Sequence, residues 1–287
     1  MTTSYENEIV VVTGASTGIG RETARSLAAK GYRVLVGVRR SSDGETIRTA
    51  NIEPVILDIT EPEHVESLAE RIACDPDARP LRALVNNAGI SLNAPVETLP
   101  LDEWRRVFEV NLFGQISVTQ ALLPLLHRSG GRIVNISSIG GRMAMATYGA
   151  YAGTKFALEA ASDALRRELE PHGVQVVVVE PGAVHSAMGE RGAQTAWRLA
   201  DAMSAEHRIR YGALVDAVVC QSVKHTRAGM PAGEAGRFVA DVVTTPRPRA
   251  RYTLGRDAAV VGFLVRVLPD RVLDRMFARS LRRFEAA

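Results

Sequence analysis

Short apolar runs alternate with helical segments from residue 9 to residue 179 of this 287-residue chain. The runs consist mainly of valine, isoleucine and leucine, and they lie at 9–12, 34–38, 55–57, 81–85, 132–136 and 174–179. Strands without polar alternation are typical of a parallel sheet that helices cover on both faces. The alternation therefore predicts an α/β fold with a doubly wound parallel sheet flanked by helices.

The segments between these runs carry the start and stop signals of helices. Gly31 would end a helix over 21–30, and Pro62 stands near the start of the next helix. Residues 101–127 are predicted as a long helix, bent or interrupted near Pro124 because proline has no amide hydrogen to donate. A second long helix is expected over 148–170.

The pattern changes after Pro181 and Gly182. Residues 183–245 are predicted as helix and loop that form a lid over the substrate, and 249–254 as a last edge strand. From residue 256 onward, two amphipathic helical stretches are separated by Pro269. We therefore expect one domain over 1–255 and a basic helical tail over 256–287 that packs on it.

Cysteine and histidine usage gives no sign of a metal site. The two cysteines, Cys74 and Cys220, lie far apart without a CxxC partner, and the six histidines show no HExxH spacing. We expect no bound metal and a reducing, cytoplasmic location. The polar and acidic segment 1–8 does not have the pattern of a signal peptide.

The net charge of +3 is unevenly distributed. Residues 245–287 hold ten arginines and four acidic residues (10 − 4 = +6), which leaves about −3 for the remainder. We expect no nucleic-acid partner because no nucleic-acid motif accompanies this charge, and the apolar run 258–265 is too short to span a bilayer. Packing of the tail over the substrate pocket is the preferred interpretation, with peripheral membrane contact as the less favoured one.

A glycine-rich turn, TGASTGIG at 13–20, joins the first apolar run to the first helix. Glycines at this place let the backbone approach a pyrophosphate, which the amide groups of the helix N-terminus can bind. The context predicts a dinucleotide site in a Rossmann-type fold. The expected contacts from this turn are Gly14, Ser16, Thr17, Gly18, Ile19 and Gly20.

The end of the second apolar run bears on the choice of cofactor. An acidic residue there would bind the ribose hydroxyls of NAD, but Val38 is followed by Arg39 and Arg40. A guanidinium suits a 2′-phosphate. We therefore favour NADP(H) without excluding NAD(H); the alternative is that both arginines are ordinary surface charges.

Tyr151 stands four residues before Lys155, and Ser138 stands thirteen before Tyr151. Positions i and i+4 share one face of a helix, so the phenol and the ammonium can enter one pocket. A nearby cation would lower the pKa of a phenol from about 10, and such a phenol can exchange a proton with an alcohol oxygen. The alternative is a surface tyrosine beside a solvated lysine.

Together these motifs resemble the classical short-chain dehydrogenases/reductases, most closely the retinol- and hydroxysteroid-dehydrogenase-like members. The similarity runs from about residue 8 to residue 188. It rests on the order and spacing of the turn at 13–20, Asp58, the sequence NNAG at 86–89, Asn111, Ser138, Tyr151, Lys155, and Pro181 with Gly182.

The resemblance implies a role for each matching position. Ser138 would bind the substrate oxygen, Tyr151 would be the general acid/base, and Lys155 would hold the nicotinamide ribose and lower the Tyr151 pKa. Asn111 would anchor a water that links Lys155 to solvent. Further cofactor contacts would come from Asp58 and Ile59 at the adenine, from Asn86, Ala88 and Gly89, and from Pro181, Gly182, Val184 and Ser186 at the nicotinamide. Asp58 could instead be a simple cap, and Asn111 a helix-interior asparagine in a polar contact.

The resemblance implies an NADP(H)-dependent oxidoreductase that interconverts an alcohol and a ketone or aldehyde. A small apolar substrate of retinoid, steroid or lipid type is expected. The alternatives are a ketoreductase for acyl thioesters or polyketides, and a non-catalytic regulator that binds a dinucleotide. Family members commonly pair through their long helices, here 101–127 and 149–170, so a homodimer or homotetramer is expected.

Overall fold

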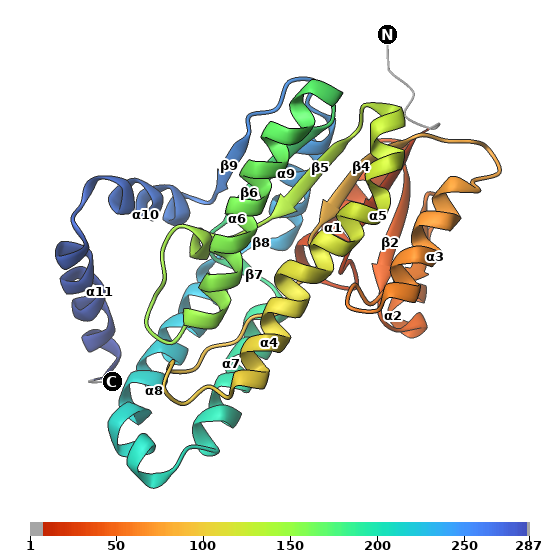
Figure 1. Cartoon of the computed structure of the whole chain (residues 1–287). Helices are drawn as coiled ribbons and strands as arrows, with labels where there is room; N and C mark the ends of the chain where they lie inside the picture. Colours follow the sequence, from red (N-terminus) through yellow and green to blue (C-terminus); the bar gives the residue numbers. More distant parts are fainter. Residues whose placement is uncertain (1–7, 286–287) are drawn as a thin grey trace.

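A parallel sheet forms the centre of the computed structural model, which describes residues 8–285 (Figure 1). Its seven strands follow the order β3-β2-β1-β4-β5-β6-β9, and all neighbouring pairs are parallel. The strands are β1 (Ile9–Val12), β2 (Arg33–Val38), β3 (Ile52–Ile56), β4 (Leu81–Asn86), β5 (Arg132–Ile136), β6 (Gln175–Pro181) and β9 (Arg251–Leu254). The predicted doubly wound, Rossmann-type sheet is confirmed. Most of segment 1–8 lies outside the described residues, as do the last two residues of the tail.

Helices cover both faces of this sheet. Alternate residues of one strand point to opposite faces, so Val10 and Val12 belong to one apolar core while Ile9 and Val11 belong to the other. The first core lies against α1 (Gly18–Ala29) and α9 (Ala232–Thr244). The second lies against α3 (Pro62–Ala73), α5 (Gly114–Ser129) and the end of α6 (Gly149–Leu169). The short helices α2 (Ser41–Glu45), η2 (Ile139–Gly141) and η3 (Glu170–His172) occupy the connections.

The long helix expected over 101–127 is interrupted, but not near Pro124. It consists of α4 (Leu101–Phe108), a π-helical turn η1 (Glu109–Phe113) and α5, and Pro124 lies inside α5. Proline is tolerated there because Pro124 and Gln120, whose carbonyl loses its partner, are both exposed to solvent. The predicted interruption near Pro124 was therefore wrong in position, since the helix is interrupted at η1 instead.

Two helices, α7 (Ala187–Asp201) and α8 (Ala205–Ala228), follow the sixth strand and pack on each other through alanine and valine side chains. We call α7 and α8 the lid. A two-stranded sheet of β7 (Val184–His185) and β8 (Met230–Pro231) closes its base. The remaining helix of the segment 183–245 is α9, which packs on α1 at the sheet.

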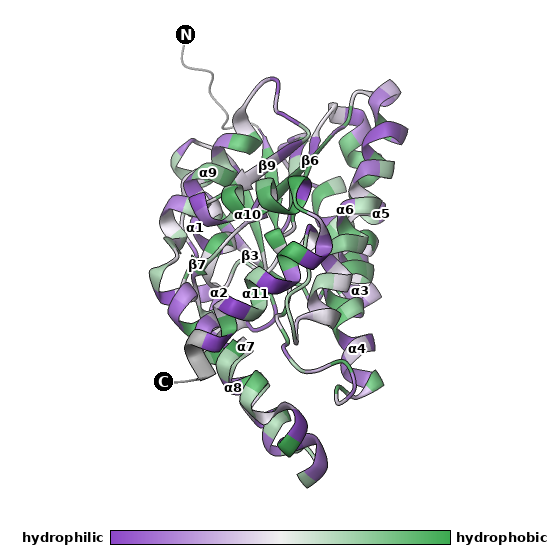
Figure 2. Ribbon diagram, turned by 90° about the vertical axis from the view of Figure 1, so that its left-hand side faces the viewer, coloured by the Kyte–Doolittle hydropathy of each residue, from purple (hydrophilic) through white to green (hydrophobic). Residues whose placement is uncertain are grey.

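The tail consists of α10 (Arg256–Val267) and α11 (Asp270–Glu285). Helix α10 contacts β9 and η2, and α11 contacts α8 (Figure 1). Figure 2 shows both tail helices on the face toward the viewer, where hydrophilic and hydrophobic residues alternate. Within residues 8–285, no helix combines the length and the apolar character needed to cross a membrane.

Arg132, at the start of β5, is a buried cation that the sequence did not reveal as special. Its side chain is 1% exposed and donates to the carbonyls of Val242, Val243 and Thr245 at the end of α9, at 2.5, 2.7 and 2.7 Å. Burial lowers the pKa of Arg132 to about 10. The guanidinium thus satisfies the carbonyl end of α9 and ties that helix to the sheet.

Candidate active site

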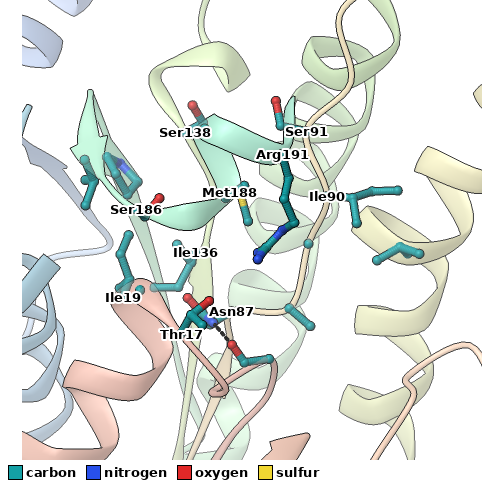
Figure 3. Close-up of a pocket in the computed structure, with 18 of the residues that line it drawn as sticks. Thr17, Ile19, Asn87, Ile90, Ser91, Ile136, Ser138, Ser186, Met188 and Arg191 are labelled. Atoms are coloured by element: carbon teal, nitrogen blue, oxygen red, sulfur yellow. Dashed lines mark hydrogen bonds between the residues drawn. The ribbon is translucent and has the colours of Figure 1, made fainter. Parts of the chain in front are cut away.

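A cleft of about 320 Å³ opens at the carboxyl ends of the central strands, beneath the lid (Figure 3). Ligand sites of open parallel sheets lie at this edge. The structure brings most of the sequence-predicted residues to its lining: Gly14, Ser16, Thr17, Gly18, Ile19, Arg39, Asp58, Ile59, Ala88, Gly89, Ser138, Tyr151, Lys155, Pro181, Gly182, Val184 and Ser186. Gly20, Arg40, Asn86 and Asn111 are not part of the lining.

The glycine-rich turn forms the floor of the cleft. Gly14 and Gly18 have φ values of +62° and +61°, a conformation that favours glycine. A Cβ at Gly14 would lie 2.7 Å from the Cα of Ala88, so the turn packs directly on the loop after β4. Because α1 begins at Gly18, its free amide groups face the cleft and suit a phosphate.

Gly20 and Asn87 hold this turn in place. A Cβ at Gly20 would lie 2.4 Å from Asn87 Nδ2, which donates to the carbonyls of Thr13 and Gly14 at 2.9 and 3.0 Å. Asn87 also lines the cleft, although the sequence assigned the role here to Asn86. Asn86 instead donates to Thr119 and Asn135, both at 2.9 Å, and joins β4 to α5 and β5.

Two arginines follow β2, and only Arg39 lines the cleft. The side chain of Arg40 is 76% exposed and forms an ion pair with Asp43 at 3.0 Å, which matches the ordinary surface charge considered for it. Asp58 lies in the cleft lining and also accepts hydrogen bonds from the backbone N and the Oγ1 of Thr60, at 3.1 and 2.7 Å. Asp58 is therefore both a turn cap before α3 and a residue of the cleft.

Ser138, Tyr151 and Lys155 all line this cleft. Lys155 is 5% exposed, its Nζ donates to the carbonyl of Ile136 at 3.0 Å, and it lies 6.0 Å from the centroid of the Tyr151 ring. Burial lowers the pKa of Lys155 to about 8, while the charge of Glu159 opposes this shift. As the sequence spacing predicts, the phenol of Tyr151 and the ammonium of Lys155 therefore lie in one pocket.

The pKa of Tyr151 shifts in the direction opposite to the one expected. Burial raises the pKa of its phenol above 10.0, and a hydrogen bond with Ser138 opposes the rise. Lys155 directs its ammonium to Ile136, and the penalty for a buried phenolate dominates. The phenol is consequently held in its protonated form at neutral pH.

A family model for short chain dehydrogenases matches residues 8–197 of this chain. The chain belongs to the short-chain dehydrogenase family. It is 36% identical to retinol dehydrogenase 5 of Mus musculus, over 96% of this chain and 89% of the relative. It is 30% identical to the NADPH-dependent 3-dehydrocapnine reductase of Ornithobacterium rhinotracheale, over 95% of this chain and 97% of that reductase.

A solved structure of a short chain dehydrogenase from Burkholderia cenocepacia J2315, in complex with NADP, has a similar fold. It superimposes with a TM-score of 0.72 at 25% identity and covers 97% of this chain and 99% of that one. As a short-chain dehydrogenase, the protein is an oxidoreductase that acts on CH–OH groups with NAD or NADP.

In this short-chain dehydrogenase the side chain of Asn111 is fully buried within the π-helical turn η1. Its Nδ2 donates to the Ile90 carbonyl at 2.9 Å and to Thr154 Oγ1 at 3.2 Å, and its Oδ1 accepts from the Ile90 amide at 2.8 Å. The side chain therefore clamps the loop after β4 onto α6. This is the polar contact considered as the alternative for Asn111.

Several residues of the cleft carry no motif and were not among the predicted site residues. Tyr148 donates to Ser222 on α8 at 3.0 Å, and its ring packs edge-on against Tyr151 with centroids 6.3 Å apart. The other lid residues in the lining include Met188, Arg191 and Thr226. Tyr148 precedes Tyr151 by three residues, a spacing that makes it a candidate for the pocket or for a helix cap, whereas no motif marks Arg191, Ser222 or Thr226 in the sequence.

Proposed function

We propose that this short-chain dehydrogenase interconverts an apolar alcohol and the corresponding ketone or aldehyde with NADP(H). The observation that carries the proposal is the convergence of Ser138, Tyr151 and Lys155 in one cleft with the glycine-rich turn at 13–20. The test is the variant Tyr151→Phe, which should bind NADPH as the wild type does and have no measurable turnover. Turnover near the wild-type rate in that variant would overturn the assignment.

Arg39 supports the preference for NADP(H). It lines the cleft at the carboxyl end of β2, where the strand is followed directly by two arginines and not by an acidic residue. The NADPH-dependent reductase among the relatives points the same way. Replacement by methionine should weaken NADPH binding about tenfold or more and leave NADH binding nearly unchanged, since a charge-assisted hydrogen bond is worth roughly 1.5–3 kcal/mol.

The cleft offers each chemical function that the reaction needs. The cofactor supplies or accepts the hydride at its nicotinamide ring. Ser138 and Tyr151 would hold the carbonyl oxygen, and Tyr151 would donate its proton to that oxygen as the carbon is reduced. The raised pKa keeps the phenol protonated and suits this direction at neutral pH. Lys155 would bind the nicotinamide ribose.

The substrate end of the cleft combines apolar and hydroxyl groups. Ile90, Val110 and Met188 supply apolar surface, and Tyr148 and Ser222 supply hydroxyls. A lipid-, steroid- or retinoid-like substrate fits this lining, in keeping with the retinol dehydrogenase named above. NADPH consumption with a panel of apolar ketones and aldehydes, and NADP reduction with the matching alcohols, would test the substrate class.

An observation on the tail favours a second candidate, a ketoreductase whose substrate arrives on a carrier. A Cβ at Gly262 of α10 would lie 3.6 Å from Ile139, the neighbour of Ser138, so the tail reaches the region of the catalytic serine. Within residues 8–282, no ion pair forms at the arginines of the tail, which could therefore receive an acidic carrier: Arg256, Arg266, Arg271, Arg275, Arg279 and Arg282. If a free apolar ketone were reduced at the same rate as the carrier-bound form of that ketone, this candidate would be excluded.

Peripheral membrane contact by the tail remains the less favoured alternative. Val260, Phe263 and Val267 of α10 are 59%, 65% and 52% exposed. Flotation with anionic and with neutral liposomes at low salt would test it, and a protein that stays unbound in both would remove it. A cytoplasmic location stays a prediction from the cysteine usage. A non-catalytic role is disfavoured because Ser138, Tyr151 and Lys155 are all present.

We expect a homodimer or homotetramer that forms through α4, α5 and α6. Phe113 on η1 and Phe156 on α6 are 52% and 46% exposed, which is unusual for aromatic side chains on helices that otherwise pack on the sheet. Light scattering after gel filtration would measure the assembly.

A further inference from the structure

The lid begins at the point where the cofactor turn ends. Ser186, which precedes α7, and Gly18, which begins α1, lie opposite each other, so that a Cβ on Gly18 would be 3.4 Å from the Cβ of Ser186. The side chains of Thr17 and Ser186, the residues that precede the two helices, make no hydrogen bond to their own helix ends. Two helix N-termini with unused hydroxyl groups therefore border the same part of the cleft.

Arg191 extends from the second turn of α7 into this part of the cleft. Figure 3 shows its side chain reaching down from the lid, with the guanidinium directed toward the half of the pocket that holds Asn87 and Thr17, away from Ser138. The helix is held close at this point because a Cβ on the neighbouring Gly192 would lie 3.3 Å from Ser91 Oγ. The packing of α7 against Ser91 thus places Arg191 next to the loop that follows β4.

The guanidinium of Arg191 has no counter-charge among the residues that the structure describes. Within residues 8–285 it forms neither an ion pair nor a hydrogen bond, whereas Arg198 on the same helix lies 3.8 Å from the carboxylate of Glu103. The charged residues of the cleft lining are Arg39, Lys155 and Arg191 against Asp58 alone. A partly enclosed cleft with this balance attracts anions, and the planar fork of a guanidinium matches phosphate oxygens.

We propose that Arg191 binds the pyrophosphate of the cofactor from the lid side, opposite the N-terminus of α1. This inference rests on the proposed use of a nicotinamide dinucleotide. The ion pair between Arg191 and the pyrophosphate would also hold α7 against the bound cofactor. Arg39 would then select the 2′-phosphate, while Arg191 would serve NADPH and NADH alike.

Binding measurements on the variants Arg191→Met and Arg191→Lys test the proposal, with Arg198→Met as a matched control from the same helix. NADPH and NADH are titrated by fluorescence. ADP, which carries the pyrophosphate, and 2′-AMP, which does not, serve as competitors. We expect Arg191→Met to lower the affinity for NADPH, NADH and ADP by about tenfold, which corresponds to the loss of one charge-assisted hydrogen bond. The affinity for 2′-AMP should not change. Arg191→Lys should recover part of the loss, and Arg198→Met should match the wild type.

Two results would overturn the proposal. One is unchanged binding of NADPH and ADP in Arg191→Met. The other is unchanged cofactor binding together with a raised KM for an acidic substrate, which would assign Arg191 to the substrate instead. A wild-type protein that binds neither NADPH nor NADH would refute the proposed function itself, and the two failures are therefore distinguishable.

Discussion

Lys155 is a buried cation whose removal should leave the fold intact while turnover is lost. In the variant Lys155→Met, the cost of burying the ammonium disappears. Burial lowers the pKa of Lys155 from 10.5 to about 8, which corresponds to a cost of about 3 kcal/mol. Against this, the carbonyl of Ile136 loses its donor at 3.0 Å, at a cost of about 1–3 kcal/mol. At pH 7 the variant should therefore be as stable as the wild type or up to about 2 kcal/mol more stable.

This stability difference should depend on pH in one direction. Below pH 8 the lysine is protonated in both the folded and the unfolded chain, and the full cost of burial is present. Between pH 8 and 10.5 the unfolded chain binds more protons than the folded chain, so the free energy of unfolding of the wild type rises with pH. The slope is about 1.4 kcal/mol per pH unit. By pH 9.5 the wild type should therefore have gained about 2 kcal/mol relative to Lys155→Met.

Urea unfolding of the cofactor-free proteins at pH 7, 8 and 9.5, followed by circular dichroism, measures this difference. Lys30→Met is the control, because Lys30 is a surface lysine in an ion pair with Asp241 at 3.1 Å and should change stability by less than about 1 kcal/mol. The reasoning would be refuted if Lys155→Met were destabilised by more than about 3 kcal/mol at pH 7, or if its difference from the wild type did not change with pH.

Three further predictions concern other parts of the molecule. Glu159→Gln removes the negative charge that raises the pKa of Lys155, so the alkaline limb of the kcat/KM profile should move to lower pH. Asp163→Asn is the control: it removes a carboxylate that shares Arg251 with Glu159, and it should leave the alkaline limb where it is. Arg132→Met should lower the free energy of unfolding by roughly 3 kcal/mol in urea titrations, because three carbonyls at the end of α9 lose their donor, and an unchanged value would contradict this. Phe113→Glu combined with Phe156→Glu should dissociate the oligomer in light scattering, whereas Phe263→Glu on the tail should not; an unchanged mass in the double variant would exclude that interface.

The order of strands and helices could be predicted because it depends on local pattern. Apolar runs without polar alternation mark strands buried on both faces, and the glycine-rich turn follows the first of them. The predicted edge strand at 249–254 is present as β9, which pairs in parallel with β6. The clustering of Ser138, Tyr151 and Lys155 also follows from spacing, since two of them share one face of α6.

Other features depend on contacts between distant segments. The π-helical turn η1 forms where Asn111 binds Ile90, 21 residues away in the sequence, and no local signal marks that bond. The direction of the Tyr151 pKa shift depends on burial by the surrounding protein, whereas spacing reveals only that a lysine is near. Arg191 and Ser222 lie in the lid helices α7 and α8, whose sequence pattern does not indicate which residues reach the cleft.

The central claim is hydride transfer with Tyr151 as the proton donor. Its most direct test is a single-turnover reaction of the wild type and of Tyr151→Phe with NADPH deuterated at nicotinamide C4 and an apolar ketone, analysed by mass spectrometry. The wild type should deliver deuterium to the former carbonyl carbon and yield the alcohol. Tyr151→Phe should bind the cofactor and yield no deuterated alcohol. A deuterated alcohol formed by the variant at the wild-type rate would contradict the account.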